Sequence, residues 1–134
     1  MIAGVGVDVV AVSGFRDQLE LDATTFTEVF TPAERDLRAT GSGDAEHLAA
    51  RWAAKEAFVK AWAGSRHGRP PQLQSVEMRD IEVVCDAWGR PALRLHGEVD
   101  EEFSRSVPDA SVHLSISHDG DVAIAYVVID RVMP

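Results

Sequence analysis

The first apolar stretch of the chain, residues 2–12, predicts a β-strand. It is rich in valine, alternates only loosely, and carries one charged residue, Asp8. Apolar runs of this length that are rich in β-branched residues are typical of strands. Ser13 follows directly and is placed to cap a short helix that would run to about Leu21.

The middle of the chain has the pattern of helices. The segment 31–34 reads Thr-Pro-Ala-Glu, which places proline at a first helical position within a capping box. It predicts a helix that ends before Gly41. After a loop and Asp44 as a possible N-cap, residues 45–63 contain no glycine or proline and are dense in strong helix formers. Their large apolar side chains recur at helical spacings and predict one buried face: Leu48, Trp52, Val59 and Trp62.

The second half of the chain predicts strands around one further helix. Residues 64–75 form the longest irregular stretch, and long loops in compact domains are often functional. The predicted elements are strands at 80–86 and 92–95, a helix at 98–105, and strands at 111–117 and 122–129, the last two joined by a hairpin turn at Asp119-Gly120. This order favours an α+β fold, a mainly antiparallel sheet with helices packed on one face, as a single domain over residues 1–134.

Composition and charge narrow the possible functions. The net charge of −9 argues against a general nucleic-acid binder, which would carry a basic surface. The sequence contains no apolar run of transmembrane length and no signal-peptide pattern, so we expect no membrane association. A single cysteine, Cys85, excludes an intrachain disulfide and suits a reducing compartment.

Asp8 is the first candidate for chemistry. It follows Gly4-Val5-Gly6-Val7 within an apolar strand, and glycines in a strand often mark a close approach by another group. An aspartate there must be paired, bound to a cation, or located at the end of the sheet. Pairing with an arginine, capping of a helix, and metal binding all remain open.

The long predicted helix contains the second candidate, Glu56 with Lys60. The two are four positions apart and share a helix face, as do Arg51 and Lys55. They form either an ordinary exposed ion pair or a cation ligand beside a phosphate partner. Mg²⁺ usually takes one or two carboxylates together with substrate phosphates, so the second reading is chemically reasonable.

The third candidate is the polar face of the strand at 111–117. Ser115 and Ser117 alternate with apolar residues, and His118 and Asp119 follow at the turn. The two hydroxyls and the imidazole could bind a phosphate or the amides of a ligand. The same pattern also describes the solvent face of an edge hairpin.

Taken together and in this order, these motifs resemble the bacterial holo-acyl-carrier-protein synthases, most of all the actinobacterial members. The resemblance runs from Val5 to Val128. Its markers are Gly4-x-Gly6-x-Asp8, Phe30-Thr31-Pro32-x-Glu34, the segment from Ala49 to Ala61 around Lys55-Glu56, Asp80-Ile81-Glu82-Val83, Gly89-Arg90-Pro91, and His113-x-Ser115-x-Ser117-His118.

The resemblance implies a Mg²⁺-dependent transferase. It would move the 4′-phosphopantetheine of coenzyme A onto a serine of an apo-acyl carrier protein, or onto the carrier domain of a fatty-acid synthase. Asp8 and Glu56 would bind Mg²⁺ and, with Lys60, form the catalytic group. The resemblance assigns coenzyme A binding to Arg51, Lys60, Gly89, Arg90, Pro91, Ser115, Ser117 and His118. We add Asp119, which follows His118 where many members have a different polar residue. The resemblance further implies a cytoplasmic homotrimer with active sites at subunit interfaces.

Several points of this reading stay open. The general base could be Glu56, Asp8 or a metal-bound water, and Asp119 could contact the metal or only form the turn. Family members often carry an arginine early in the first helix to engage the carrier, where this chain has Gly14, and the nearest arginine is Arg16. The basic residues either gather into a docking patch or are scattered: Arg16, Arg35, Arg38, Arg66 and Arg69. The alternative functions are a carrier-binding protein without catalysis, a metal-dependent enzyme acting on a nucleotide or another phosphoester, and a structural subunit.

Overall fold

Two antiparallel sheets form the β part of the protein. In the computed structural model, which describes residues 1–21, 28–36 and 44–132, a three-stranded sheet has the order β1-β5-β4. Its strands are β1 (Ile2–Ala11), β4 (Ala110–Asp119) and β5 (Val122–Arg131). A separate hairpin pairs β2 (Ile81–Cys85) with β3 (Pro91–Leu95). The predicted α+β fold is confirmed, although the strands divide into two sheets instead of one.

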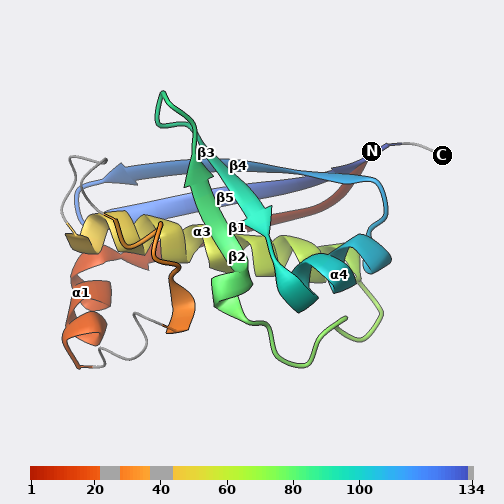
Figure 1. Ribbon diagram of the computed structural model, residues 1–134, viewed down its shortest axis with the longest axis horizontal. Helices are drawn as coiled ribbons and strands as arrows, with labels where there is room; N and C mark the ends of the chain where they lie inside the picture. Colours follow the sequence, from red (N-terminus) through yellow and green to blue (C-terminus); the bar gives the residue numbers. More distant parts are fainter. Residues whose placement is uncertain (22–27, 37–43, 133–134) are drawn as a thin grey trace.

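The helix α3 (Asp44–Ser65) lies along the three-stranded sheet, and the β2–β3 hairpin crosses its other side (Figure 1). The helix α1 (Val12–Leu21) follows β1 directly, and α4 (Gly97–Ser106) connects β3 to β4. A short 3₁₀ turn, η1 (Met78–Asp80), leads into β2. One face of the larger sheet therefore carries the helices, as the sequence predicts.

The prediction of a single buried face on α3 is too narrow. Leu48 and Trp62 are buried as expected, but so are alanines on several sides of the helix: Ala49, Ala50, Ala53, Ala54, Ala57 and Ala61. Alanine lets neighbouring backbones approach closely, and α3 has the sheet on one side and the hairpin on the other. A pattern of large apolar residues cannot reveal burial that is produced by small ones.

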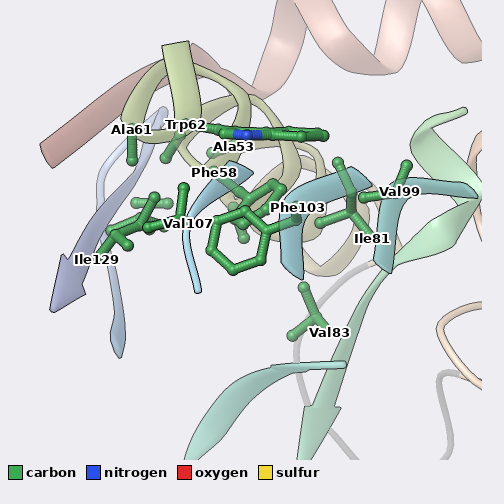
Figure 2. Packing of buried hydrophobic residues seen from close by; sticks show 14 residues of the cluster. Ala53, Phe58, Ala61, Trp62, Ile81, Val83, Val99, Phe103, Val107 and Ile129 are labelled. Atoms are coloured by element: carbon green, nitrogen blue, oxygen red, sulfur yellow. The ribbon is translucent and has the colours of Figure 1, made fainter. Parts of the chain in front are cut away.

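Aromatic rings fill the core beside the C-terminal half of α3. Phe103 of α4 contacts Phe58 with ring centroids 5.2 Å apart and Trp62 at 5.6 Å (Figure 2). The indole Nε1 of Trp62 donates a hydrogen bond to Ser106 Oγ at 2.9 Å. Edge-to-face contacts of this kind add to the burial of apolar area, so they fix α4 against α3.

Two glycines of β1 set the distance between β1 and α3. A Cβ at Gly6 would lie 2.0 Å from the carbonyl oxygen of Ala57, and one at Gly4 would lie 2.1 Å from that of Ala61. No side chain larger than hydrogen fits at either position. The sequence predicted that another group lies close to the strand at these glycines. That group is α3, whose backbone lies directly against the backbone of β1.

Two local predictions differ from the structure. The capping box forms, since Thr31 N donates to Glu34 Oε1 at 2.9 Å and Glu34 N donates to Thr31 Oγ1 at 3.2 Å. Residues 32–35 nevertheless form only a turn, and residues 37–43 of the expected helix lie outside the described residues. The helix α1 begins at Val12, one residue before the predicted cap Ser13. Its first amides bond to Asp121 of the β4–β5 turn instead.

Candidate active site

Asp8, Glu56 and Lys60 come together where β1 passes α3. Lys60 Nζ donates to Asp8 Oδ1 at 2.9 Å and to the carbonyl oxygen of Val7 at 3.1 Å. Asp8 lies on the same strand face as Gly4 and Gly6, so the close backbone contact carries its carboxylate to the helix. Its side chain is only 15% exposed, and it pairs with a lysine, whereas the sequence left an arginine partner open.

Two acidic groups share this site, and one of them resists ionisation. Burial raises the pKa of Glu56, the nearby Asp8 raises it further, and Lys60 partly opposes both. Two carboxylates side by side repel each other unless a cation or a proton lies between them. Lys60 supplies one positive charge, so the pair of carboxylates can still accommodate a divalent cation.

The carboxylates open into a cleft of about 350 Å³. Its walls come from β1, from α1 and from α3, and the residues are Asp8, Val9, Val10, Ala11, Gly14, Phe15, Gln18, Trp52 and Glu56. An apolar cavity of about 350 Å³ adjoins it and shares Phe15, Gln18 and Trp52. Sequence reasoning missed the contribution of α1, because only the fold brings that helix beside Asp8.

Among the described residues that line this cleft, the side chains suited to a metal are the carboxylates of Asp8 and Glu56, which offer oxygen atoms. Mg²⁺ prefers such hard donors, needs only one or two carboxylates, and completes its coordination with water and substrate phosphates. Within the described residues, no group of three or more His, Cys, Asp or Glu side chains is arranged to hold a metal ion. The two carboxylates therefore suit an ion that is shared with a substrate rather than one enclosed by protein.

Arg51 faces the hairpin rather than open solvent. Its Nη2 donates to Cys85 Sγ at 3.6 Å, and its buried Nε has no partner among the described residues. Burial lowers the pKa of Arg51, while the nearby Cys85 and Glu34 oppose this effect. Cys85 itself is exposed, although it lies on the same face of β2 as the buried Ile81 and Val83.

The polar residues of β4 divide between the two faces of the sheet. Ser115 pairs with Tyr126, which also pairs with Val7, so these three side chains lie on the face away from α3. Ser117 lies on the same outer face. His118 lies on the inner face, where its Nδ1 is 2.8 Å from Glu46 Oε1 of α3. Within one chain, His118 therefore lies on the α3 side with Asp8, and the two serines do not.

The tip of the β2–β3 hairpin projects away from the rest of the chain (Figure 1). Asp86 organises the turn by accepting hydrogen bonds from Arg90 Nε at 2.6 Å and from the amides of Trp88 and Arg90 at 2.9 Å each. Gly89 has a φ of +80°, which favours glycine. The turn presents Arg90 against the ring of Trp88, which is 79% exposed.

Lys55, next to Glu56, is wholly buried. Its Nζ donates to Glu34 Oε1 at 2.9 Å and to the carbonyl oxygens of Met78 and Ile81. Glu34 Oε2 in turn accepts from the amide of Val83 at 2.9 Å. This ion pair ties α3, the turn after Thr31 and β2 together. No local pattern indicated this pair, because a lysine four positions after an arginine is typical of an exposed helix face.

The basic residues do not form one patch in a single chain. Arg16 lies on α1, near the beginning of α3, whereas Arg66 and Arg69 follow the end of α3 (Figure 1). Arg35 lies in the turn after Thr31, and Arg38 lies outside the described residues. The positions of these arginines in the described part of one chain favour scattered surface charges over a single docking patch.

Comparison with known proteins places this site in a family. Residues 4–127 match a family model described as the 4′-phosphopantetheinyl transferase superfamily. The chain belongs to this superfamily. The match covers β1 with Asp8, α3 with Glu56 and Lys60, and β4 with His118, and it confirms the resemblance inferred from the motifs.

Relatives and solved structures agree over nearly the full chain. A holo-[acyl-carrier-protein] synthase of Mycobacterium sp. (strain KMS) is 48% identical over 131 residues, which are 97% of this chain and 98% of the relative. An ACPS-CoA complex from Chronobacterium ammoniagenes has a TM-score of 0.89 at 46% identity, and the alignment covers 97% of this chain and 98% of that one. The acyl carrier protein synthase of Mycobacterium tuberculosis has a TM-score of 0.78 at 42% identity, covering 98% and 99%.

In the part of the chain that the structure describes, no helix has both the length and the apolar character needed to cross a bilayer.

Proposed function

We propose that this chain is a holo-[acyl-carrier-protein] synthase. It transfers 4′-phosphopantetheine from coenzyme A to a serine of an apo-acyl carrier protein and releases adenosine 3′,5′-bisphosphate. One observation carries the proposal: Asp8, Glu56 and Lys60 converge at a cleft in a chain of the 4′-phosphopantetheinyl transferase superfamily. Similarity to the ACPS-CoA complex supports coenzyme A as the donor.

Asp8 and Glu56 are the residues that would hold Mg²⁺. They are hard oxygen donors on two elements that the glycines of β1 bring close together. A Mg²⁺ ion bound there would neutralise the charge of the coenzyme A diphosphate.

The chain's own cations would bind and orient the donor. Lys60 is 54% exposed and needs only to turn from Asp8 to reach a phosphate that enters the cleft. Because Nδ1 of His118 faces Glu46, its Nε2 is the nitrogen left for a ligand. With Arg51, these residues would hold the nucleotide portion. Asp119 lies on the outer face with Ser115 and Ser117, so it would serve a site shared with a neighbouring copy.

We propose that the active form is a homotrimer with sites at the subunit interfaces. The outer face of the three-stranded sheet exposes six large apolar residues: Val5, Val7, Val9, Val122, Ile124 and Tyr126. An apolar patch of this extent on a sheet face is typical of a protein interface. Ser115 and Ser117 lie on that face, and Gly89-Arg90-Pro91 lies on the projecting hairpin, so a neighbouring copy would bring them to a site.

The remaining parts of the proposal concern partners and location. The acceptor is a free acyl carrier protein or the carrier domain of a fatty-acid synthase. We propose the cytoplasm as the place of reaction and residues 1–134 as one functional domain. Nucleic acid and membranes have no part in it, in keeping with the net charge of −9.

Intact-mass spectrometry of the acceptor tests the function directly. Apo-acyl carrier protein is incubated with this protein, coenzyme A and Mg²⁺, with EDTA in a parallel sample. We expect a mass gain of one phosphopantetheine that EDTA abolishes. The test is repeated with a carrier domain of a fatty-acid synthase as acceptor. No gain with either acceptor, while coenzyme A still binds, would refute transfer and favour a carrier-binding protein without catalysis.

A further inference from the structure

The turn between β4 and β5 holds the beginning of α1. Asp121 Oδ1 accepts from the amide of Ser13 at 2.9 Å, and Asp121 Oδ2 accepts from Ser13 Oγ at 2.5 Å. The carbonyl oxygen of Asp121 accepts from the amide of Val12 at 2.8 Å. Three hydrogen bonds thus join one residue of the turn to the first two residues of the helix.

The first amides of a helix have no partner within the helix, and a local side chain normally supplies one. Here the acceptor comes from a residue 108 positions further along the chain. Its negative charge also lies at the positive end of the helix dipole. The start of α1 is therefore fixed to the sheet by Asp121 and not by its own sequence.

Beyond these hydrogen bonds, α1 is held by a small apolar contact, in which the ring of Phe15 packs edge-on against Phe30 with centroids 6.3 Å apart. Of its ten residues only Val12 and Phe15 are buried. Leu21 at its end is 87% exposed. A helix with so small an apolar face depends on its end contacts, because its own residues give it little stability in isolation.

The position of α1 matters because this helix forms one wall of the cleft. Gly14, Phe15 and Gln18 line the cleft together with Asp8 and Glu56. None of the groups assigned to coenzyme A belongs to α1, since they lie on α3, on β4 and on the β2–β3 hairpin. The α1 wall is therefore the side of the cleft left for the second substrate, the protein that brings the serine.

We infer that Asp121 is a positioning residue that holds α1 in the place where the acceptor carrier protein docks. The inference rests on the proposed function. Loss of Asp121 would let α1 leave this place for part of the time, and the apparent affinity for the carrier falls with the fraction of molecules that can bind. Coenzyme A binding would stay as it is, because β1, α3 and β4 do not depend on the turn contact to Ser13.

Steady-state kinetics of Asp121→Ala test this inference. A helix cap is worth about 1 kcal/mol, so we expect the carrier KM to rise by up to about fivefold. The coenzyme A KM should stay within about twofold. Asp121→Asn keeps one acceptor oxygen and should recover most of the loss. Ser13→Ala keeps the amide bond and should give an intermediate value. Asp100→Ala, an exposed aspartate in the first turn of α4, is the matched control and should behave as wild type.

Amide hydrogen exchange gives a second measurement that does not need activity. In Asp121→Ala the amides at the start of α1 should exchange faster, while those of α3 stay protected. An unchanged carrier KM, or an equal rise of both KM values, would overturn the role of Asp121 while leaving transfer established. Wild-type protein that transfers nothing would instead refute the proposed function.

Discussion

Replacing Gly6 by alanine should separate the two halves of the active site. The added Cβ would lie 2.0 Å from Ala57 O and 2.6 Å from Ala61 N, both of them backbone atoms of α3. Cβ atoms essentially never lie closer than 3.0 Å to such neighbours, so strand and helix must move apart by about 1 Å. Asp8 belongs to the strand and Glu56 to the helix, so this movement directly changes the distance between their carboxylates.

The size of the effect follows from packing and from catalysis. Overfilling a well-packed contact lowers the free energy of unfolding by about 1–3 kcal/mol, and a displacement of about 1 Å at a catalytic group can reduce the rate about 100-fold. We therefore expect folded Gly6→Ala protein with roughly 1% of the wild-type kcat. It should also require more Mg²⁺ for half-maximal activity.

Thermal unfolding and transfer kinetics over a Mg²⁺ titration measure both parts. Gly64→Ala is the matched control, because a Cβ there would meet only Val5 O at an ordinary 3.8 Å. Gly64 lies in the same helix, so this variant should be fully active and slightly more stable. Gly6→Ala protein with wild-type kcat and Mg²⁺ dependence would show that the site tolerates the displacement, and the argument from close packing would be refuted.

Three further predictions concern the charges and the outer face. Glu56→Gln should reduce transfer at least about 100-fold. Burial and Asp8 raise the pKa of Glu56, so its protonated form stabilises the metal-free fold below pH 4.5 and this contribution is lost as pH rises. Urea unfolding in EDTA should therefore show the variant to be more stable than wild type at neutral pH and equally stable in acid. Lys55→Met leaves the buried Glu34 without its ion-pair partner and should lower the free energy of unfolding by about 3–5 kcal/mol. Adding Glu34→Gln should recover part of this loss, and equal stability of the single and double variants would contradict the ion-pair role. Tyr126→Asp places a charge in the proposed trimer interface and should shift the sedimentation profile toward monomer. Ser104→Asp, at an exposed position of α4, is the control, and a Tyr126→Asp variant that remains trimeric would point to another interface.

The sequence was sufficient for the parts of the site that depend on local spacing. Glu56 and Lys60 are four residues apart on a helix, so they share a face. Gly4 and Gly6 indicate that another element lies close to the strand backbone beside Asp8. The hairpin ending at Asp119 was visible because turn residues separate two apolar runs. These features need only the periodicity of a single element, and the structure has each of them.

Contacts between distant segments could not be read in the same way. Nothing near Ser13 indicates that Asp121 accepts its amide, and nothing near Lys55 indicates that Glu34 lies beside it in the core. The outward placement of Ser115 also depends on which sheet face α3 covers, and alternation along β4 cannot decide that. Each of these facts depends on tertiary packing, which local propensity does not encode.

The buried ion pair also has a consequence for how α3 can respond to change. Leu48, Phe58 and Trp62 fix the orientation of α3 near its two ends, whereas the buried apolar residues of its middle part are mostly alanines. Lys55 fixes that middle part, because a turn of the helix by one residue would bury its ammonium away from Glu34. We therefore expect α3 to respond to mutation or ligand binding by sliding or tilting, and not by rotating about its own axis. Glu56 is the residue after Lys55, so its carboxylate continues to point toward the cleft when the helix slides or tilts.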